Sequence, residues 1–156
     1  MIGRIFVDTN VLVYARDVAE AEKHARALGW MAALWAERAG ALSWQVLHEY
    51  YVSVTRKLRP PRDPVMARED VASLIAWNPI PLDLTTVDAA WAIEDRFGLP
   101  WWDALIVGAA QVGRCTFLLT EDLQDGQTFD GVTIISPFTH APEIILGSSS
   151  PPAPPA

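Results

Sequence analysis

Four acidic side chains in this sequence lie next to apolar segments that are typical of buried strands and helices. Asp8 follows the apolar run 5–7, Glu49 and Asp103 lie in helical patterns, and Asp122 follows a second short apolar run. Carboxylates that share one site repel each other unless cations lie between them. Oxygen ligands with few nitrogen or sulfur partners suit Mg²⁺ or Mn²⁺. The matching chemistry is metal-assisted hydrolysis of a phosphodiester, in which the metal lowers the pKa of a bound water.

The segments that must position these acids alternate between strand and helix patterns. Short apolar runs predict strands at 5–7, 41–43, 79–84, 117–120 and 132–135. Helical spacing and capping residues predict helices at 20–38, 45–57, 65–76, 85–97 and 100–112, with a short helix beginning at Thr9 or Asn10. The prolines at 79 and 81 favour an edge position for their strand.

This alternation predicts an α/β fold with a mostly parallel sheet that is covered by helices on both faces. Parallel strands end at the same edge of a sheet, and ligands bind outside those ends in open α/β sheets. Asp8, Glu49, Asp103 and Asp122 can therefore share one site. An alternative interpretation of Asp8 remains open at this point, because Asp also serves as a helix N-cap.

Composition favours one globular domain at residues 1–146 and a flexible Pro/Ser-rich tail at 147–156. The chain has 156 residues, 51% of them hydrophobic, and a net charge of −7. This charge argues against broad electrostatic binding of nucleic acid, although a nuclease with clustered acids is compatible with it. The single cysteine, Cys115, excludes an internal disulfide. No apolar run reaches the length of a transmembrane helix and no signal-peptide pattern is present, so we expect a cytoplasmic protein without membrane contact.

Four motifs resemble the PIN-domain ribonucleases, and the VapC-type toxins of bacterial toxin–antitoxin pairs in particular. They are Val7-Asp8-Thr9-Asn10-Val11-Leu12, Gln45-Val46-Leu47-His48-Glu49, Trp102-Asp103-Ala104-Leu105-Ile106 and Leu119-Thr120-Glu121-Asp122-Leu123. The resemblance spans residues 4–138. It implies a three-layer α/β/α sandwich, Mg²⁺- or Mn²⁺-dependent cleavage of RNA, a homodimer and a neutralising antitoxin protein.

The resemblance also implies roles for the acids. Asp8 and Asp103 match the acids that hold the metal most directly, and Glu49 and Asp122 match those that complete the site. At the fourth position Glu121 and Asp125 compete with Asp122. Asp122 is preferred because it follows the strand end at Thr120 by the expected step.

Four further residues are candidates for contact with substrate. Thr9 and Asn10 can cap the first helix, orient Asp8 or approach substrate. Arg56 and Lys57 belong to a basic cluster that also contains Arg59, Arg62 and Arg68. Such a cluster is either ordinary solvated surface or a local patch that contacts phosphates.

Two other classes of function compete with the ribonuclease. One is a catalytically silent PIN-fold protein that acts as a protein-binding module, and the presence of all four acids argues against it. The other is a phosphatase with Asp8 as nucleophile. Such enzymes carry a second Asp two residues later, where this chain has Asn10.

The tryptophans are a large aromatic load for one small domain. Trp101 and Trp102 are interpreted as packing residues, with base stacking as the alternative. Core packing and exposure at an interface are equally open for Trp30, Trp35, Trp77 and Trp91.

Overall fold

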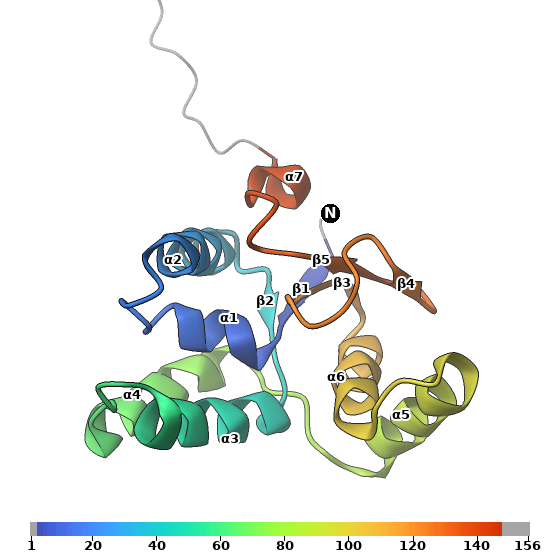
Figure 1. Cartoon of the computed structure of the whole chain (residues 1–156). Helices are drawn as coiled ribbons and strands as arrows, with labels where there is room; N and C mark the ends of the chain where they lie inside the picture. The colour runs from blue at the N-terminus through green and yellow to red at the C-terminus, as the bar shows by residue number, and fades with distance from the viewer. Residues whose placement is uncertain (1–2, 148–156) are drawn as a thin grey trace, which may run out of the picture.

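A computed structural model describes residues 3–147, and its centre is a five-stranded sheet of order β2-β1-β3-β5-β4 (Figure 1). The strands are β1 (Arg4–Val7), β2 (Gly40–Ala41), β3 (Cys115–Leu119), β4 (Thr128–Phe129) and β5 (Val132–Ile135). All neighbouring pairs are parallel except β4 with β5. This arrangement confirms the predicted α/β fold and its mostly parallel sheet.

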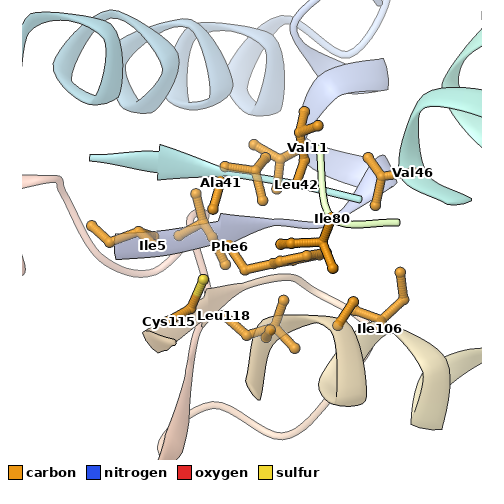
Figure 2. Packing of buried hydrophobic residues seen from close by; sticks show 14 of the residues in the cluster. Ile5, Phe6, Val11, Ala41, Leu42, Val46, Ile80, Ile106, Cys115 and Leu118 are labelled. Carbon is orange, nitrogen blue, oxygen red and sulfur yellow. The ribbon is translucent and has the colours of Figure 1, made fainter. Parts of the chain in front are cut away.

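Helices flank the sheet. They are α1 (Thr9–Tyr14), α2 (Ala21–Glu37), α3 (Trp44–Val52), α4 (Pro64–Leu74), α5 (Leu84–Phe97), α6 (Trp101–Val112) and α7 (Glu143–Leu146). A π-helical turn, Ser53–Lys57, continues α3, and a 3₁₀ turn, Ile75–Trp77, continues α4. Figure 2 shows α1 and α2 on one side of β1 and α6 on the other. Figure 1 shows α3 beside α1, α4 beside α3, and α5 beside α6.

Local sequence explains where most of these helices begin. Asp8, Ser43, Asp63 and Asp83 are N-caps whose side chains accept hydrogen bonds from backbone N–H groups of α1, α3, α4 and α5. Asp83 therefore caps α5, which begins at Leu84, one residue before the predicted start at 85. Gly98 ends α5 in the left-handed conformation, at φ 69°.

The core lies between the sheet and the helices. Ile5, Phe6 and Leu118 are fully buried on the two central strands, and Figure 2 shows them among Val11, Val46 and other apolar side chains. Helix α6 packs on β3 and against α5, and a side chain at Gly108 would overlap the backbone of Ala90. This close approach fixes α6, and with it the first turn that carries Asp103.

The predicted strand at 79–84 is reduced to one bridging residue, Ile80, beside Ser43. Ile80 donates its N–H to the Leu42 carbonyl and accepts from Trp44 N–H. Pro79 and Pro81 lack an N–H donor, so the ladder stops on both sides of Ile80. The edge position that the prolines indicated is correct, whereas the length of the strand was overestimated.

The hairpin β4–β5 was missing from the sequence-based prediction. Its turn residues Asp130 and Gly131 both have positive φ, 45° and 94°, as a two-residue hairpin turn of type I′ requires.

No helix within residues 3–147 is long and apolar enough to cross a membrane. The prediction of a flexible tail concerns residues that, apart from Gly147, lie outside the described part.

Candidate functional site

Asp8 lies at the end of the central strand β1 and is the most buried of the four acids, with 6% of its surface exposed. Oδ1 accepts a hydrogen bond of 2.7 Å from Thr9 N–H, and Oδ2 accepts one of 2.8 Å from the hydroxyl of Thr120. Thr120 follows the neighbouring strand β3. Asp8 is therefore both a helix cap and a member of a polar cluster, so the two interpretations of this residue are compatible.

Burial raises the pKa of Asp8 to about 7, although the hydrogen bonds from Thr120 and Thr9 act in the opposite direction. The charges of Asp122 and Glu49 raise this pKa further. A carboxylate in such a position is poorly stabilised as an anion by the protein alone. A nearby cation would favour its ionised form.

Glu49 is held by two side chains from different elements. Its Oε2 accepts a hydrogen bond of 2.7 Å from the Thr9 hydroxyl, and its Oε1 accepts one of 2.9 Å from the Gln45 amide, one turn earlier on α3. The Gln45 amide also reaches the carbonyl of Trp102 at 3.4 Å. Gln45 is almost fully buried, so it links α3 to the first turn of α6 from the interior.

Asp103 lies in the first turn of α6, where the helix dipole favours a negative charge. Within residues 3–147 no donor forms a hydrogen bond with its carboxylate, which is half-buried. Burial raises the pKa of Asp103, and the charges of Asp122 and Glu49 add to this effect. Asp103 is thus the acid that is least engaged by the protein itself.

Asp122 is the most exposed of the four acids and is linked to Asp8 through Asn10. The Asn10 amide donates to Oδ2 of Asp122 at 3.1 Å, and it also lies 3.0 Å from the Thr120 hydroxyl and 3.5 Å from Oδ2 of Asp8. Thr9 and Asn10 therefore direct their polar atoms to the acids, one to Glu49 and the other to Asp122.

Glu121 and Asp125, the competitors for the fourth position, make contacts elsewhere. Glu121 forms an ion pair of 2.8 Å with Lys23 of α2. Asp125 accepts from Ser136 N–H at 2.8 Å and lies 2.8 Å from His140 Nε2. Asp122 alone among the three shares a hydrogen-bond donor with Asp8.

The four acids come from four separate segments, and Glu49 and Asp122 lie within electrostatic reach of both Asp8 and Asp103. Glu49 and Asp122 each raise the pKa of Asp8 and of Asp103. The segments are the end of β1, helix α3, the first turn of α6 and the loop after β3. This placement matches the carboxyl edge of a parallel sheet.

The chemistry of these donors fits a hard divalent cation that keeps most of its waters. Within residues 3–147 no group of three or more His, Cys, Asp or Glu side chains is close enough to hold a metal ion as it lies. Mg²⁺ is commonly held by only one or two carboxylates and retains several waters. Asn10 Oδ1 is a buried oxygen without a hydrogen-bond partner in the described residues, and such an atom gains from a nearby donor or cation.

The basic candidates lie farther along α3 and its continuation. Arg56 and Lys57 are exposed in the π-helical turn, seven and eight residues after Glu49. Arg62 differs from them, because its Nε and Nη2 bind Asp70 at 2.6 and 3.0 Å. Of the predicted basic cluster, Arg62 thus serves to hold its loop on α4.

Two contributors were not recognised as such in the sequence. Thr120 was noted only as a strand end, yet it donates to Asp8. Gln45 was named only as the first residue of a motif, yet it donates to Glu49 and to the Trp102 carbonyl. The signal was present, because both are polar residues next to the end of a predicted strand in a parallel sheet.

An α/β sheet with an acidic cluster at its carboxyl edge defines the class of this protein. Residues 5–125 match the PIN domain family, and the chain belongs to that family. Among solved structures, a toxin–antitoxin complex from Klebsiella pneumoniae is similar, with 21% sequence identity and a TM-score of 0.56. The likeness covers 86% of this chain and 98% of that chain, and at this identity it concerns the fold. No curated protein sequence matches the chain.

Proposed function

We propose that the protein is a metal-dependent endoribonuclease and the toxin of a bacterial type II toxin–antitoxin pair, resembling VapC. The observation that carries this proposal is the placement of Glu49 and Asp122 at one edge of the sheet, where hydrogen bonds join them to Thr9 and Asn10 beside Asp8 and where their charges act on both Asp8 and Asp103. Membership of the PIN family supports it, since PIN domains are typically nucleases and generally depend on metal. The similar fold in a toxin–antitoxin complex supports the second part.

In this proposal the four acids have different roles. Asp8 and Asp103 would hold Mg²⁺ or Mn²⁺, with Glu49 and Asp122 completing the set of acids. When bound, the cation would lower the pKa of a water for attack on the phosphodiester and stabilise the leaving oxygen. Hydrogen bonds from Thr120 and from Thr9 N–H keep the Asp8 carboxylate oriented.

Glu49 cannot rotate freely, because Thr9 and Gln45 each donate to one of its oxygens. Asn10 fixes Asp122 relative to Asp8 in the same way. Thr9 and Asn10, both candidates for contact with substrate, thus act on the reaction mainly by orienting acids. Arg56 and Lys57 are the better candidates for contact with RNA phosphates, since both are exposed and neither forms an ion pair among residues 3–147.

The proposed partners are RNA, a cognate antitoxin protein and a second copy of the chain, in the cytoplasm. Trp35 and Trp91 support a protein interface, because 42% and 48% of their surfaces are exposed. Trp30 and Trp77 do not contribute, since both are buried. Aromatic residues are enriched in protein interfaces and depleted on ordinary surface.

Incubation of the purified chain with RNA and Mn²⁺, with and without a chelator, tests the activity. We expect cleavage inside the RNA chain that requires metal and is lost in Asp103→Asn. RNA that stays intact with every divalent cation, combined with tight capture of an antitoxin, would favour the catalytically silent PIN-fold module instead.

A further inference from the structure

We propose that Trp102 is a stacking platform for one unpaired nucleobase of the substrate, at the rim of the acidic site. This inference rests on the proposed ribonuclease function, and it deepens that function by assigning a residue to base contact. The argument uses three properties of Trp102: its exposure, its attachment to the acids and its lack of charge.

The indole of Trp102 is unusually exposed for its position in the fold. Trp102 has 63% of its surface exposed, whereas Ala104 through Ala110 of the same helix are buried. The preceding residue, Trp101, is half-buried and packs near Trp91 with ring centroids 6.4 Å apart. Within residues 3–147 no aromatic ring pairs with Trp102. The interpretation of both tryptophans as packing residues therefore holds for Trp101 and is wrong for Trp102.

The backbone of Trp102 is attached directly to the acidic site. It adjoins Asp103, whose Cα lies about 3.8 Å away across a trans peptide. Its carbonyl accepts from the Gln45 amide at 3.4 Å, and the same amide donates to Glu49 at 2.9 Å. The indole thus extends from a point that is one residue from Asp103 and one hydrogen-bonded side chain from Glu49.

A stacking contact meets a specific need of this protein. The chain carries a net charge of −7, so electrostatic attraction of RNA is weak overall. In the proposed function, four acids would also lie close to the phosphodiester. The face of an indole binds any nucleobase without depending on charge. A base can lie on that face only if it is free of its own neighbours, as in single strands and loops. Trp102 would therefore hold RNA close to the acids despite their repulsion.

The test measures RNA binding in the Asp103→Asn background, so that the RNA stays intact. The probes are a short single-stranded oligoadenylate, an abasic ribose-phosphate oligomer of the same length and an A·U duplex. We expect Trp102→Ala to weaken oligoadenylate binding about 5- to 150-fold. Trp102→Phe should retain most of the affinity, because it keeps an aromatic face. Binding of the abasic oligomer should be unchanged in all variants, and the duplex should bind equally weakly to all of them.

Trp35→Ala is the matched control. Trp35 is also exposed, but it lies on α2 and packs on Trp77. The Trp77 carbonyl accepts a hydrogen bond from Arg4 at the start of β1. Trp35 therefore lies near the end of β1 that is opposite Asp8. Its replacement should leave oligoadenylate binding unchanged. A second readout is tryptophan fluorescence, which oligoadenylate should quench in the parent protein and not in Trp102→Phe. The melting temperatures of all variants verify that they are folded.

Three results would overturn the inference. The first is unchanged affinity of folded Trp102→Ala for oligoadenylate. The second is that Trp102→Ala loses as much affinity for the abasic oligomer as for oligoadenylate. The third is that Trp102→Ala converts a dimer into a monomer, which would assign Trp102 to a protein interface. The proposed function fails separately. If the unmutated chain binds oligoadenylate through Trp102 but never cleaves RNA with metal, stacking survives and the nuclease does not. If the unmutated chain cleaves RNA and Trp102→Ala binds oligoadenylate normally, the nuclease proposal survives and the stacking proposal does not.

Discussion

The hydroxyl of Thr120 lies 2.8 Å from Oδ2 of Asp8, and these two residues follow neighbouring parallel strands, β3 and β1. This hydrogen bond stabilises the ionised form of a carboxylate that burial disfavours. Burial has the larger effect, because the pKa of Asp8 is raised to about 7. The protein therefore keeps at its centre an acid that is only partly ionised at neutral pH without a cation.

The first prediction concerns the stability of the metal-free protein between pH 4 and pH 7. In this range Asp8 is ionised in the unfolded chain but still protonated in the folded one. The folded state thus holds one more proton, and the free energy of unfolding should fall as pH rises. The contribution of this one group is up to about 1.4 kcal/mol per pH unit, and it ceases above pH about 7, the raised pKa.

Urea unfolding at several pH values, with chelator present, measures this effect as the difference between wild type and Asp8→Asn. This difference should change with pH, because only wild type carries the Asp8 carboxyl whose pKa is raised. Asp95→Asn, which removes an exposed carboxylate on α5, should run parallel to wild type. Parallel curves for all three proteins would show that Asp8 has an ordinary pKa.

The order of strands and helices could be predicted because periodicity and capping are local properties. The long helix at 20–38 is found at Ala21–Glu37, and the strand pattern at 132–135 is found as β5. The strand expected around Ile80 was overestimated, because its length depends on donors that Pro79 and Pro81 lack. The turn at Asp130 and Gly131 could have been recognised, since Asp-Gly is a strong local hairpin signal.

The sequence predicted which acids form the candidate site, but it did not predict which side chains donate hydrogen bonds to them. Topology alone brings Asp8 and Asp122 to one edge, because both follow central parallel strands. The donors to each oxygen depend on packing between helices, which no local pattern encodes. Gln45 shows this limit, since its contact with the carbonyl of Trp102 joins residues 57 positions apart.

A second prediction is that Gln45→Leu lowers the rate of RNA cleavage about 10- to 100-fold, as expected for a side chain that orients a ligand of the metal. The substitution removes the donor to Glu49 Oε1 while keeping a buried side chain of similar length. RNA affinity should stay nearly unchanged, because Gln45 is almost fully buried. Cleavage kinetics with excess enzyme and a separate binding assay distinguish the two effects.

Gln111→Leu is the control for this change. Gln111 is also an amide on a helix, half-buried where Gln45 is buried, and it donates to the Phe129 carbonyl at 3.5 Å, away from the acids. Its loss should leave cleavage unaffected. A normal rate in Gln45→Leu would mean that Thr9 alone is sufficient to hold Glu49.

A third prediction assigns the basic turn after α3. If Arg56 and Lys57 contact phosphates, changing both to Ala should weaken RNA binding and reduce the magnitude of its salt dependence. Each contact with single-stranded nucleic acid contributes about 0.7 to the slope of log affinity against log salt, so the slope should fall by about 1.4. Titrations of RNA at several salt concentrations give the slope directly.

The control is a second double variant, in which two other exposed arginines are changed to Ala. They are Arg26 of α2 and Arg38, the C-terminal cap of that helix. The control has the same net charge as the test protein. An equal decrease of the slope in both proteins would indicate a general effect of charge, and the turn at 56–57 would then be ordinary surface.

The last prediction tests the acidic cluster through Asp103→Asn, which keeps the shape of the side chain and removes one charge. In the metal-free protein the acids repel one another, so the melting temperature of the variant should equal or exceed that of wild type. A cation removes this repulsion in wild type and stabilises it by about 2.7 kcal/mol at 100 times its dissociation constant. This corresponds to a rise of about 5–11 °C in melting temperature, at 2–4 °C per kcal/mol for a domain near this size.

The gain from Mn²⁺ should therefore shrink in Asp103→Asn, and RNA cleavage should fall by orders of magnitude. Asp95→Asn is the matched control, because Asp95 also lies on a helix but is exposed, and it should change neither property. Thermal unfolding with and without Mn²⁺, together with a cleavage assay, covers both expectations. Within residues 3–147 the Asp103 carboxylate accepts no hydrogen bond, so a bound cation is its expected partner. Normal cleavage by Asp103→Asn, or an equal loss of the metal response in both variants, would therefore contradict a shared metal site.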